Sequence, residues 1–563
     1  MPSLGRHPIK NSIAHGRDLF LSLLEQEGVT HIFGNPGTTE LAIMHALNDH
    51  PDLTYVLGLQ ESIVVAMADG FARASGRLSA CNVHVAPGLG NAIGSIYNAN
   101  QTGSPLIITA GQQEQGHGLT EPLLYGPMIE MARPVVKWAH EINRLEDMPR
   151  VIHRAAKIAT TPPTGPVFLS LPGDILNQQA EISLGTPTRV DSVGRPSDAA
   201  LEALIQRIFA AQCPVIVAGA EVVASDAQTE IADLAEVLGV PVYQQTVPSG
   251  AHFRSRHPAF MGCLTRDQQK VRDALEPYDL MLAVGSDILQ MSVWSSIDPL
   301  PGHLSVIQIG LRDWEMGKNY PAEIAIRHDV GETLRALVPL LRERADSNPK
   351  TRTDRSLTDI EANNWSARRK SRAAKTATMA ERTPIDPEWL MMTISETIAE
   401  DTIVVDEGLT AAKTLLDYLP LQDRHSYFGM VSGGIGWGIA AAVGIGLAQP
   451  ARRIVAVIGD GSALYSPQAL WTAAHLAVPI TFIILNNRGY RILKERLYAF
   501  HGDDRYIGMD FKTPPIDMAG LARSFGMPGE QVSEPGRFAD SLSEALERAG
   551  PALLEVMVEP GPG

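Results

Sequence analysis

The fold class is decided by residues 454–462, which read Ile-Val-Ala-Val-Ile-Gly-Asp-Gly-Ser. A second apolar run, residues 480–486, reads Ile-Thr-Phe-Ile-Ile-Leu-Asn, and Asn487 follows it directly. Between the two runs lies a helical stretch that begins near Gln468. Strands that alternate with helices in this way predict a parallel sheet that is covered by helices on both faces.

Polar groups follow both strands at the position where ligands bind in open parallel sheets. Asp460 offers an anionic oxygen and Asn487 a neutral one, a pair that suits Mg²⁺ bound together with phosphate oxygens. The glycines beside Asp460 let backbone N–H groups approach a phosphate, and the helix near Gln468 directs its N-terminal dipole toward it. Each turn alone is ordinary, but the two together predict a diphosphate–Mg²⁺ site.

The same alternation of strands and helices extends over the whole chain. The predicted strands are 30–33, 53–57, 80–84, 106–109 and 167–171 in a first unit, 214–217, 240–243, 280–284 and 304–309 in a second, and 402–405, 453–458, 480–486 and 553–558 in a third. We therefore predict an α/β protein with three doubly wound parallel-sheet domains, at residues 1–185, 196–345 and 384–563. Two polar stretches, 177–199 and 346–383, are interpreted as linkers, the second as a solvated connector.

Composition excludes several classes of protein. The 563 residues include 47 Lys and Arg against 63 Asp and Glu, which gives a formal net charge of −16. A chain this acidic lacks the extended basic surface of a protein that binds nucleic acid or an anionic membrane. Cys81, Cys213 and Cys263 form no Cys-x-x-Cys pair, which argues against a disulfide framework or a structural zinc site. The first residues lack an apolar signal segment, and no uncharged apolar stretch is long enough to span a membrane. We therefore expect a cytoplasmic protein that binds neither nucleic acid nor membrane.

The motif Gly459-Asp460-Gly461 with Asn486-Asn487 resembles the thiamine diphosphate (ThDP) motif of 2-keto-acid decarboxylases and acetolactate synthases. The remaining matches are most similar, in order and spacing, to the benzoylformate decarboxylase family. They are Phe-Gly-Asn-Pro-Gly-Thr-Thr-Glu at 33–40, Asn-Val-His-Val-Ala-Pro-Gly at 82–88, Gly-Asn-Ala at 90–92, Thr-Ala-Gly-Gln-Gln at 109–113 and Arg-Pro-Val-Val-Lys-Trp at 133–138. The resemblance covers nearly the whole chain and is tight mainly in the first and third units. It implies a pyrimidine-binding domain, a middle domain and a diphosphate domain, with ThDP and Mg²⁺ as cofactors.

The resemblance also implies which residues bind the cofactor. They are Asp460, Asn487 and the backbone carbonyl of Gly489 for the metal, Gly461, Ser462, Tyr490 and, more weakly, Thr410 for the diphosphate, and Gly434 with Ile435 for the bend of ThDP. Taken alone, Ile435 would be an ordinary core residue.

Three residues of the first unit match catalytic positions of the family. Glu61 stands where a glutamate hydrogen-bonds the aminopyrimidine N1′, although alone it would be an acid favoured by a helix N-terminus. His84 matches a histidine that binds the substrate carboxylate and shuttles a proton, a task that suits imidazole. A structural histidine is the alternative. Thr38 falls where the family has a serine on the substrate carboxylate, and a helix cap is its alternative.

The chain also departs from the family pattern. The family has a second catalytic histidine in its middle domain, whereas the matching stretch here, residues 285–294, contains none. His117 is a candidate substitute, with a solvent-exposed loop histidine as an equal alternative. The aryl-pocket phenylalanine of the family falls near Arg496, which would either bind a second anion on the substrate or point to solvent.

The resemblance implies a lyase that decarboxylates a 2-keto acid through a ThDP enamine and releases CO₂ and an aldehyde. A carboligase or 2-hydroxyacyl lyase, which joins or cleaves carbon–carbon bonds with the same cofactor, is the alternative. Acetolactate synthases also carry FAD in the middle domain, and residues 201–344 show no decisive feature for or against it. A catalytically inactive binding protein is a weaker alternative, because the residues Glu61, His84, Asp460 and Asn487 are all present. A generic nucleotide-binding protein is another, because no GxGxxG or Walker A motif is present. The family implies a homodimer at minimum and typically a homotetramer, with the active site shared between subunits.

Overall fold

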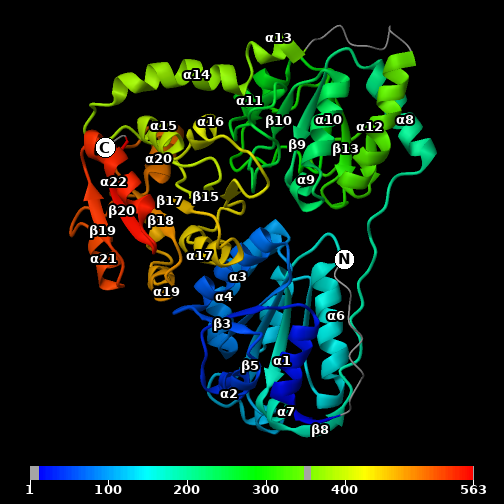
Figure 1. Cartoon of the computed structure of the whole chain (residues 1–563), viewed down its shortest axis with the longest axis vertical. Coiled ribbons are helices and arrows are strands. Elements are labelled where there is room, and N and C mark those ends of the chain that lie inside the picture. The colour runs from blue at the N-terminus through cyan, green and yellow to red at the C-terminus, as the bar shows by residue number, and fades with distance from the viewer. Residues whose placement is uncertain (1–11, 348–356, 562–563) are drawn as a thin grey trace.

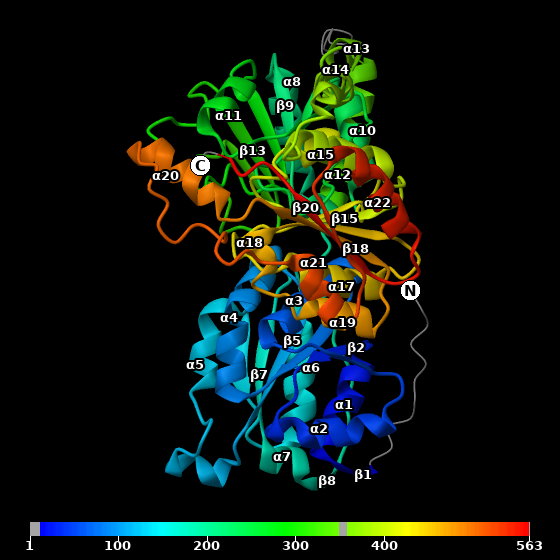
Figure 2. The ribbon, with the colours of Figure 1, turned by 90° about the vertical axis from the view of Figure 1, so that its left-hand side faces the viewer.

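The computed structural model describes residues 12–347 and 357–561, which form three six-stranded parallel sheets (Figures 1 and 2). The N-terminal sheet contains β2 (His31–Gly34), β3 (Thr54–Leu57), β4 (Ser79–Val83), β5 (Leu106–Gln112), β6 (Trp138–Glu141) and β7 (Val167–Pro172). The middle sheet contains β9 (Pro214–Ala218), β10 (Val242–Gln244), β11 (Phe260–Cys263), β12 (Leu280–Val284), β13 (Ser305–Gly310) and β14 (Ile324–Arg327). The C-terminal sheet contains β15 (Ile403–Glu407), β16 (Tyr427–Gly429), β17 (Ile454–Gly459), β18 (Ile480–Asn486), β19 (Gly529–Val532) and β20 (Ala552–Met557). The prediction of three parallel-sheet α/β units is confirmed.

Helices cover both faces of each sheet, as parallel sheets require. Those of the N-terminal unit are α1 (Gly16–Gln26), α2 (Leu41–Ala46), α3 (Glu61–Ser75), α4 (Val85–Thr102), α5 (Met128–Ala132), α6 (Met148–Thr160) and α7 (Gly173–Asn177). The middle unit has α8 (Asp198–Ala210), α9 (Ala220–Ala224), α10 (Gln228–Leu238), α11 (Gln268–Leu275) and α12 (Val330–Ser347). The C-terminal unit has α15 (Pro387–Thr397), α16 (Leu415–Tyr418), α17 (Gly438–Ala448), α18 (Asp460–Ala463), α19 (Ala469–His475), α20 (Arg491–His501), α21 (Met518–Ser524) and α22 (Pro535–Glu547).

The N-terminal and C-terminal sheets share one strand order. Numbered within each unit, both run 2-1-3-4-6-5, as β3-β2-β4-β5-β7-β6 and β16-β15-β17-β18-β20-β19, whereas the middle sheet runs 3-2-1-4-5-6. In an open parallel sheet, ligands bind at the carboxyl ends of the strands where the order reverses direction. That point lies between β2 and β4 in the N-terminal unit and between β15 and β17 in the C-terminal unit.

The N-terminal and C-terminal units meet through helices α3 and α17 (Figure 1). Helix α17 is apolar all round, as expected of a helix that is buried on every side. The two backbones touch, because a Cβ on Gly444 would lie 1.9 Å from the carbonyl oxygen of Met67. Glycine is therefore required at this crossing.

Arg73, on α3, connects all three units. Its guanidinium donates hydrogen bonds to the carbonyls of Ser249 at 2.6 Å and Gly429 at 3.2 Å, and it lies 4.7 Å from the centre of the Trp437 ring. The Trp437 indole donates a 2.6 Å hydrogen bond to Asp69, one turn before Arg73. Burial lowers the pKa of Arg73, so the neighbouring carboxylate and carbonyls compensate the desolvated charge.

The two segments interpreted as linkers hold regular structure. In the first, β8 (Gln179–Ile182) pairs antiparallel with β1 (Ser12–His15). The second contains α13 (Leu357–Glu361) and α14 (Trp365–Thr376), and its residues 348–356 lie outside the described residues. Trp365 is only 4% exposed and donates to the Leu416 carbonyl at 2.8 Å. The interpretation as a wholly solvated connector was therefore wrong: helix α14 packs across the middle and C-terminal units (Figure 1).

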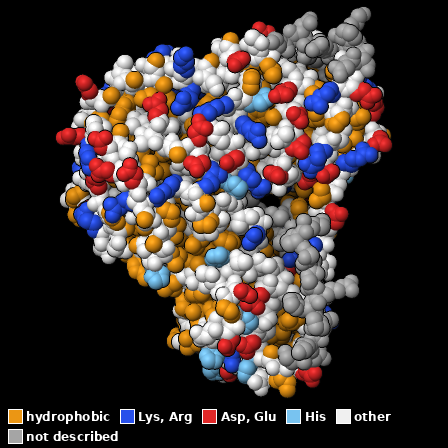
Figure 3. Space-filling view, in the orientation of Figure 1, with side chains coloured by type: hydrophobic (Ala, Val, Ile, Leu, Met, Phe, Trp, Pro, Cys, Tyr) orange, Lys and Arg blue, Asp and Glu red, His pale blue; other side chains and the backbone are white. Residues whose placement is uncertain are grey.

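Acidic and basic side chains are interspersed over the visible face of the molecule (Figure 3). Across residues 12–347 and 357–561, none of the helices has the length and apolar character that a membrane crossing requires.

Candidate active site

The first half of the candidate site lies at the carboxyl edge of the N-terminal sheet. Asn35 follows β2 and His84 follows β4, the two strands between which the strand order reverses. Directly after His84 the chain turns at Val85, the first residue of helix α4, whose φ is +40°. A β-branched residue rarely adopts this conformation, and such strain is found mainly where a functional side chain must be held in place.

A buried carboxylate fixes the His84 ring. Glu40 has no exposed surface, and its Oε2 lies 2.7 Å from His84 Nδ1. A carboxylate only accepts hydrogen bonds, so this contact selects the tautomer in which Nδ1 carries a proton and Nε2 is the acceptor. The same carboxylate accepts from Gly37 N at 2.9 Å, Gly111 N at 2.8 Å and the Thr39 hydroxyl at 2.8 Å.

The contact between Glu40 and His84 depends on glycine at position 37. A Cβ there would lie 2.0 Å from His84 Nδ1. The Thr39 hydroxyl lies 3.3 Å from His84 Nδ1. Thr38 begins a short 3₁₀ turn and is exposed.

Glu61 is the first residue of helix α3 and is 7% exposed. Gln60 caps the helix, since its side chain accepts from the Ser62 backbone N–H at 2.6 Å. The Glu61 carboxylate accepts one amide hydrogen bond from Asn35 at 3.2 Å and one from Asn91 at 3.0 Å. Both amides and the carboxylate therefore share the strand-end crevice of the N-terminal sheet.

The second half of the candidate site lies at the carboxyl edge of the C-terminal sheet. Asp460 follows β17, and its carboxylate accepts from Gly461 N at 2.9 Å and from Gly489 N at 3.2 Å. Asn486, which ends β18, and Asn487, which follows it, differ in role. Asn486 donates to Glu555 at 2.5 Å, whereas Asn487 Oδ1 is buried without a hydrogen-bond partner among the described residues.

This donor set fits a divalent cation. An unpartnered buried oxygen is costly, and a bound cation would remove that cost. Burial raises the pKa of Asp460 to about 6, and a cation beside the carboxylate would favour its charged form. The residues predicted to bind the metal, Asp460, Asn487 and Gly489, are thus brought together, and they offer the oxygen ligands that Mg²⁺ takes.

The remaining cofactor residues lie around the same edge. Ser462 is buried, and the Tyr490 ring packs against Gly461, where a Cβ would lie 2.8 Å from the ring. Gly434 accepts a 2.9 Å hydrogen bond from Asn98 of helix α4 through its carbonyl, and Ile435 follows it in the loop before α17. Thr410 is half-buried after β15.

Glu407, at the end of β15, fixes this loop. Its carboxylate accepts from Gly436 N at 2.5 Å and from Gly438 N. Burial raises the pKa of Glu407 to about 7. Glu407 was not predicted as a site residue, although it lies between the quoted motifs at 133–138 and 459–461.

Two other predicted residues lie away from these groups. His117 is exposed in a 3₁₀ segment (Gln115–Thr120), and among the described residues no side-chain contact joins it to His84. Arg496, on helix α20, is directed toward the middle unit, with its guanidinium 3.5 Å from the Ser292 hydroxyl.

The crevice of the middle sheet is occupied by the chain itself. Glu221, on α9, accepts a 2.6 Å hydrogen bond from Leu311 N, and its side chain packs against Gly285 and Gly310. Burial raises the pKa of Glu221 to about 7.

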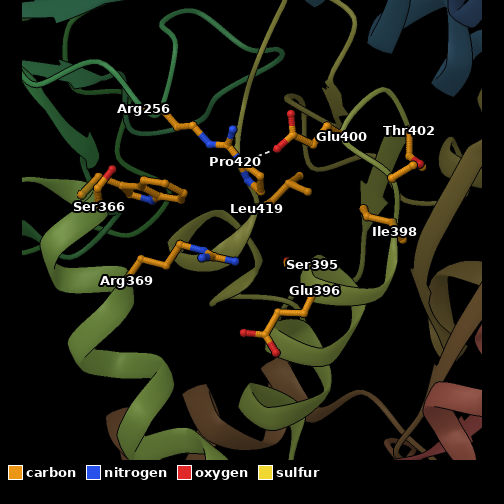
Figure 4. A pocket seen from close by; sticks show the side chains of 12 residues that line it. Arg256, Ser366, Arg369, Ser395, Glu396, Ile398, Glu400, Thr402, Leu419 and Pro420 are labelled. Atoms are coloured by element: carbon orange, nitrogen blue, oxygen red, sulfur yellow. Dashed lines mark hydrogen bonds and ion pairs between the residues drawn. The ribbon is translucent and has the colours of Figure 1, made fainter.

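A further cleft lies elsewhere on the described part of the chain. Its volume is about 560 Å³, and it runs between helix α14 and the start of the C-terminal unit, with Arg369 and Glu396 among its lining residues (Figure 4). It contains none of the predicted site residues.

Three family models match this chain. They describe the N-terminal TPP binding domain (residues 14–123), the central domain (201–337) and the C-terminal TPP binding domain (410–556) of thiamine pyrophosphate enzymes, thiamine pyrophosphate being another name for ThDP.

Individual relatives agree with the models. A benzoylformate decarboxylase from Pseudomonas aeruginosa is 33% identical over 95% of this chain and 97% of its own. A probable acetolactate synthase large subunit from Methanocaldococcus jannaschii is 27% identical over 97% and 92%. The structure of a ThDP-dependent 4-hydroxybenzoylformate decarboxylase from Rhodococcus jostii superposes with a TM-score of 0.86, at 31% identity over 97% and 99%. The chain therefore belongs to the family of ThDP-dependent enzymes.

Proposed function

We propose that this enzyme is a ThDP- and Mg²⁺-dependent lyase that decarboxylates a 2-keto acid to an aldehyde and CO₂. When bound, ThDP supplies a thiazolium that accepts the electron pair left as CO₂ departs. The chain's own residues then have to bind the cofactor, orient the substrate and move protons.

The C-terminal half-site is assigned to the metal and the diphosphate. Asp460, Asn487 through its unpartnered Oδ1, and the Gly489 carbonyl would hold Mg²⁺. Ser462, Tyr490, Gly461 and Thr410 would contact the diphosphate, and Gly434 with Ile435 would support the bent cofactor.

Glu61 is assigned to the aminopyrimidine. Its carboxylate would share a proton with the ring nitrogen N1′, a role that requires an acid within hydrogen-bond reach. The amides of Asn35 and Asn91 hold the carboxylate in one orientation.

The observation that carries the decarboxylase assignment is the 2.7 Å contact between Glu40 and His84 Nδ1. It leaves His84 Nε2 as the group that faces the crevice and exchanges a proton with the substrate. The His84 side chain is 22% exposed, so the ring can contact a ligand while it stays hydrogen-bonded to Glu40. Thr39 and the exposed Thr38 are the nearby hydroxyls for the substrate carboxylate, whereas His117 has no such support from the structure.

A carboligase is the second candidate. The absence of a histidine at residues 285–294 favours it, because fewer groups are then available to protonate the carbon that CO₂ leaves. In that case the carbon that CO₂ leaves would form a bond to a second carbonyl compound instead of accepting a proton.

We further propose that the enzyme works as a homodimer or a homotetramer of two such dimers. Helices α4, α5, α18 and α20 lie along one edge of the molecule (left in Figure 2). Large apolar side chains are exposed on and near these elements, namely Tyr97 (43%), Leu119 (95%), Leu123 (87%), Tyr465 (56%), Tyr498 (57%) and Phe500 (61%). Self-association is the economical way to remove such a surface from water.

The test is CO₂ release from benzoylformate, pyruvate and branched and dicarboxylic 2-keto acids in the presence of ThDP and Mg²⁺, with products identified by mass spectrometry. We expect an aldehyde from at least one acid and no activity from Glu61→Gln. A two-substrate ligation product would instead establish the carboligase, and no CO₂ from any acid would exclude decarboxylation. Light scattering at several concentrations tests the assembly, and a monomeric active enzyme would refute it.

A further inference from the structure

Helix α20 begins two residues after the predicted metal ligand Gly489, and it carries three basic residues. Two of them are neutralised: Arg491 pairs with Glu495 at 2.8 Å and Lys494 with Asp510 at 2.6 Å. Within the described part of the chain, Arg496 has no acidic partner within 4.0 Å. It is therefore the uncompensated cation of a helix whose other charges are paired.

Arg496 is held at the boundary between the C-terminal and middle units. The contact with Ser292 Oγ, at 3.5 Å, is at the limit of a hydrogen bond and leaves most of the five guanidinium donors free. The Ser292 loop is itself fixed, because Gln268 donates a 2.6 Å hydrogen bond to the Val293 carbonyl. The guanidinium thus has a defined position and unused donors.

The position is close to the candidate active site. Arg496 stands six residues after Tyr490, whose ring packs on Gly461 in the predicted diphosphate loop. At 1.5 Å per helical residue this separation is about 9 Å along the helix, within the combined reach of a long arginine side chain and a small substrate. Helices α18 and α20 also lie along the same edge of the molecule (Figure 2).

We propose that Arg496 binds a second carboxylate on the substrate, so that this enzyme acts on dicarboxylic 2-keto acids. This inference rests on the proposed decarboxylase function and names its substrate class. A guanidinium presents a planar pair of donors that matches a carboxylate, and an arginine stays charged at all relevant pH values. The Ser292 hydroxyl orients it, as a positioning residue.

The two halves of the site then recognise opposite ends of the substrate. The keto-acid end faces His84 and the threonines of the N-terminal unit, and the far carboxylate faces Arg496. Among the basic residues of α20, Arg491 and Lys494 cannot take this role without breaking their existing ion pairs.

The experiment compares substrates matched in size that differ in one carboxylate. Holoenzyme is assayed for CO₂ release with 2-oxoglutarate against 2-oxopentanoate, and with 4-carboxybenzoylformate against benzoylformate. We expect the dicarboxylic member of at least one pair to have a kcat/KM about 10- to 100-fold higher, mainly through KM, as one charge-assisted hydrogen-bonded pair allows. Arg496→Met should abolish this preference while leaving the monocarboxylic substrates unchanged, and Arg496→Lys should retain part of it.

Two controls show whether an effect of Arg496→Met is specific to substrates with a second carboxylate. Arg505→Met removes another exposed arginine that pairs with Asp503 shortly after α20, and it should leave both substrate classes unchanged. Calorimetric titration of the holoenzyme with unreactive glutarate and pentanoate measures binding without turnover. Arg496→Met should lose only the glutarate affinity.

The outcomes distinguish this inference from the proposed function. Equal kcat/KM within both pairs, or an equal loss on both classes in Arg496→Met, would overturn the role of Arg496 and leave a decarboxylase. CO₂ from monocarboxylic acids alone would do the same. No CO₂ from any acid would overturn the proposed function and this inference with it.

Discussion

Replacing Glu40 with glutamine tests whether a buried carboxylate controls the chemistry of His84. All four hydrogen bonds to this carboxylate come from donors, two to each oxygen: Gly37 N and His84 Nδ1 to Oε2, Gly111 N and Thr39 Oγ1 to Oε1. A glutamine amide keeps only one of these two oxygens as an acceptor and replaces the other with an NH₂ group, which donates. In either orientation, the new NH₂ group faces donors and leaves a backbone N–H without a partner.

The expected losses of stability and of activity follow from the hydrogen bonds that the amide cannot make. One buried unsatisfied N–H costs about 1–3 kcal/mol of stability. If the NH₂ faces His84, the ring changes tautomer and Nε2 no longer accepts a proton. If it faces Gly111, the bond to His84 survives but loses its ionic character, which is worth about 1–2 kcal/mol. We therefore expect Glu40→Gln to lower kcat by about 5- to 30-fold, since each 1.36 kcal/mol is one decade in rate.

The assay is kcat for CO₂ release at saturating ThDP and Mg²⁺, with thermal unfolding measured on the same preparations. Glu27→Gln is a matched control, because Glu27 is a buried carboxylate that contacts His153 Nδ1 at 2.5 Å outside the candidate site. It should lose stability with unchanged kcat. The double variant Glu40→Gln/His84→Ala should be no slower than His84→Ala alone, as expected of residues that act as one unit.

The result that would refute this reasoning is a folded Glu40→Gln enzyme with kcat within about 3-fold of the original, a change too small for a lost charged hydrogen bond. An equal loss of kcat in Glu27→Gln would show that the effect reports general destabilisation.

Three further predictions address the metal, the backbone and pH. Asn487→Leu should weaken Mg²⁺-dependent ThDP binding by at least about 10-fold in calorimetry, yet leave the apoprotein no less stable, because it removes an unpartnered buried oxygen; unchanged affinity would exclude Asn487 as a ligand. Gly37→Ala should cost about 1–3 kcal/mol of stability in denaturant unfolding and slow the reaction, since its Cβ would lie 2.0 Å from His84 Nδ1; an unaffected variant would show that the turn relaxes. Burial raises the pKa of Glu221 to about 7, so its neutral form contributes stability that is complete below pH 4.5 and is lost as pH rises through 7, by at most about 3 kcal/mol. Glu221→Gln should therefore flatten the dependence of the melting temperature on pH between 5 and 8, and an unaltered profile would contradict this assignment.

The central strands of each sheet could be predicted from the sequence, whereas several edge strands could not. Strands such as β17 and β18 are buried along their whole length and read as continuous apolar runs. In the three six-stranded sheets, the strands without a prediction are β6, β11, β14, β16 and β19, and all lie at the edges of their sheets. An edge strand has a neighbour on one side only and is partly exposed, so its residues need not be uniformly apolar. In β14 and β19 most positions are at least partly exposed.

For the candidate site, the sequence predicted the residues that follow buried strands and missed those that support them. Asp460 and Asn487 each follow an apolar run, which is a local signal, whereas His84 was assigned through the family resemblance. Glu40 has no such signal, because its importance comes from the contact with His84, 44 residues away in the sequence. Its only sequence marker was membership in the quoted stretch 33–40, which was read for Thr38. The amides of Asn35 and Asn91 around Glu61 were missed for the same reason.

The shared strand order of the outer sheets explains how one chain divides the labour of catalysis. Because both sheets run 2-1-3-4-6-5, each has a crevice after its first and third strands. After β2 and β4 the sequence places the carboxylate of Glu40 and the imidazole of His84, to which we assign proton transfer. After β15 and β17 it places Glu407, which fixes a glycine loop, and Asp460, which accepts hydrogen bonds from backbone N–H groups. The fold supplies the same position twice, and the residues that follow the strands decide its chemistry. Substitutions after β2 and β4 should therefore act mainly on kcat, and those after β15 and β17 mainly on the affinity for ThDP and Mg²⁺.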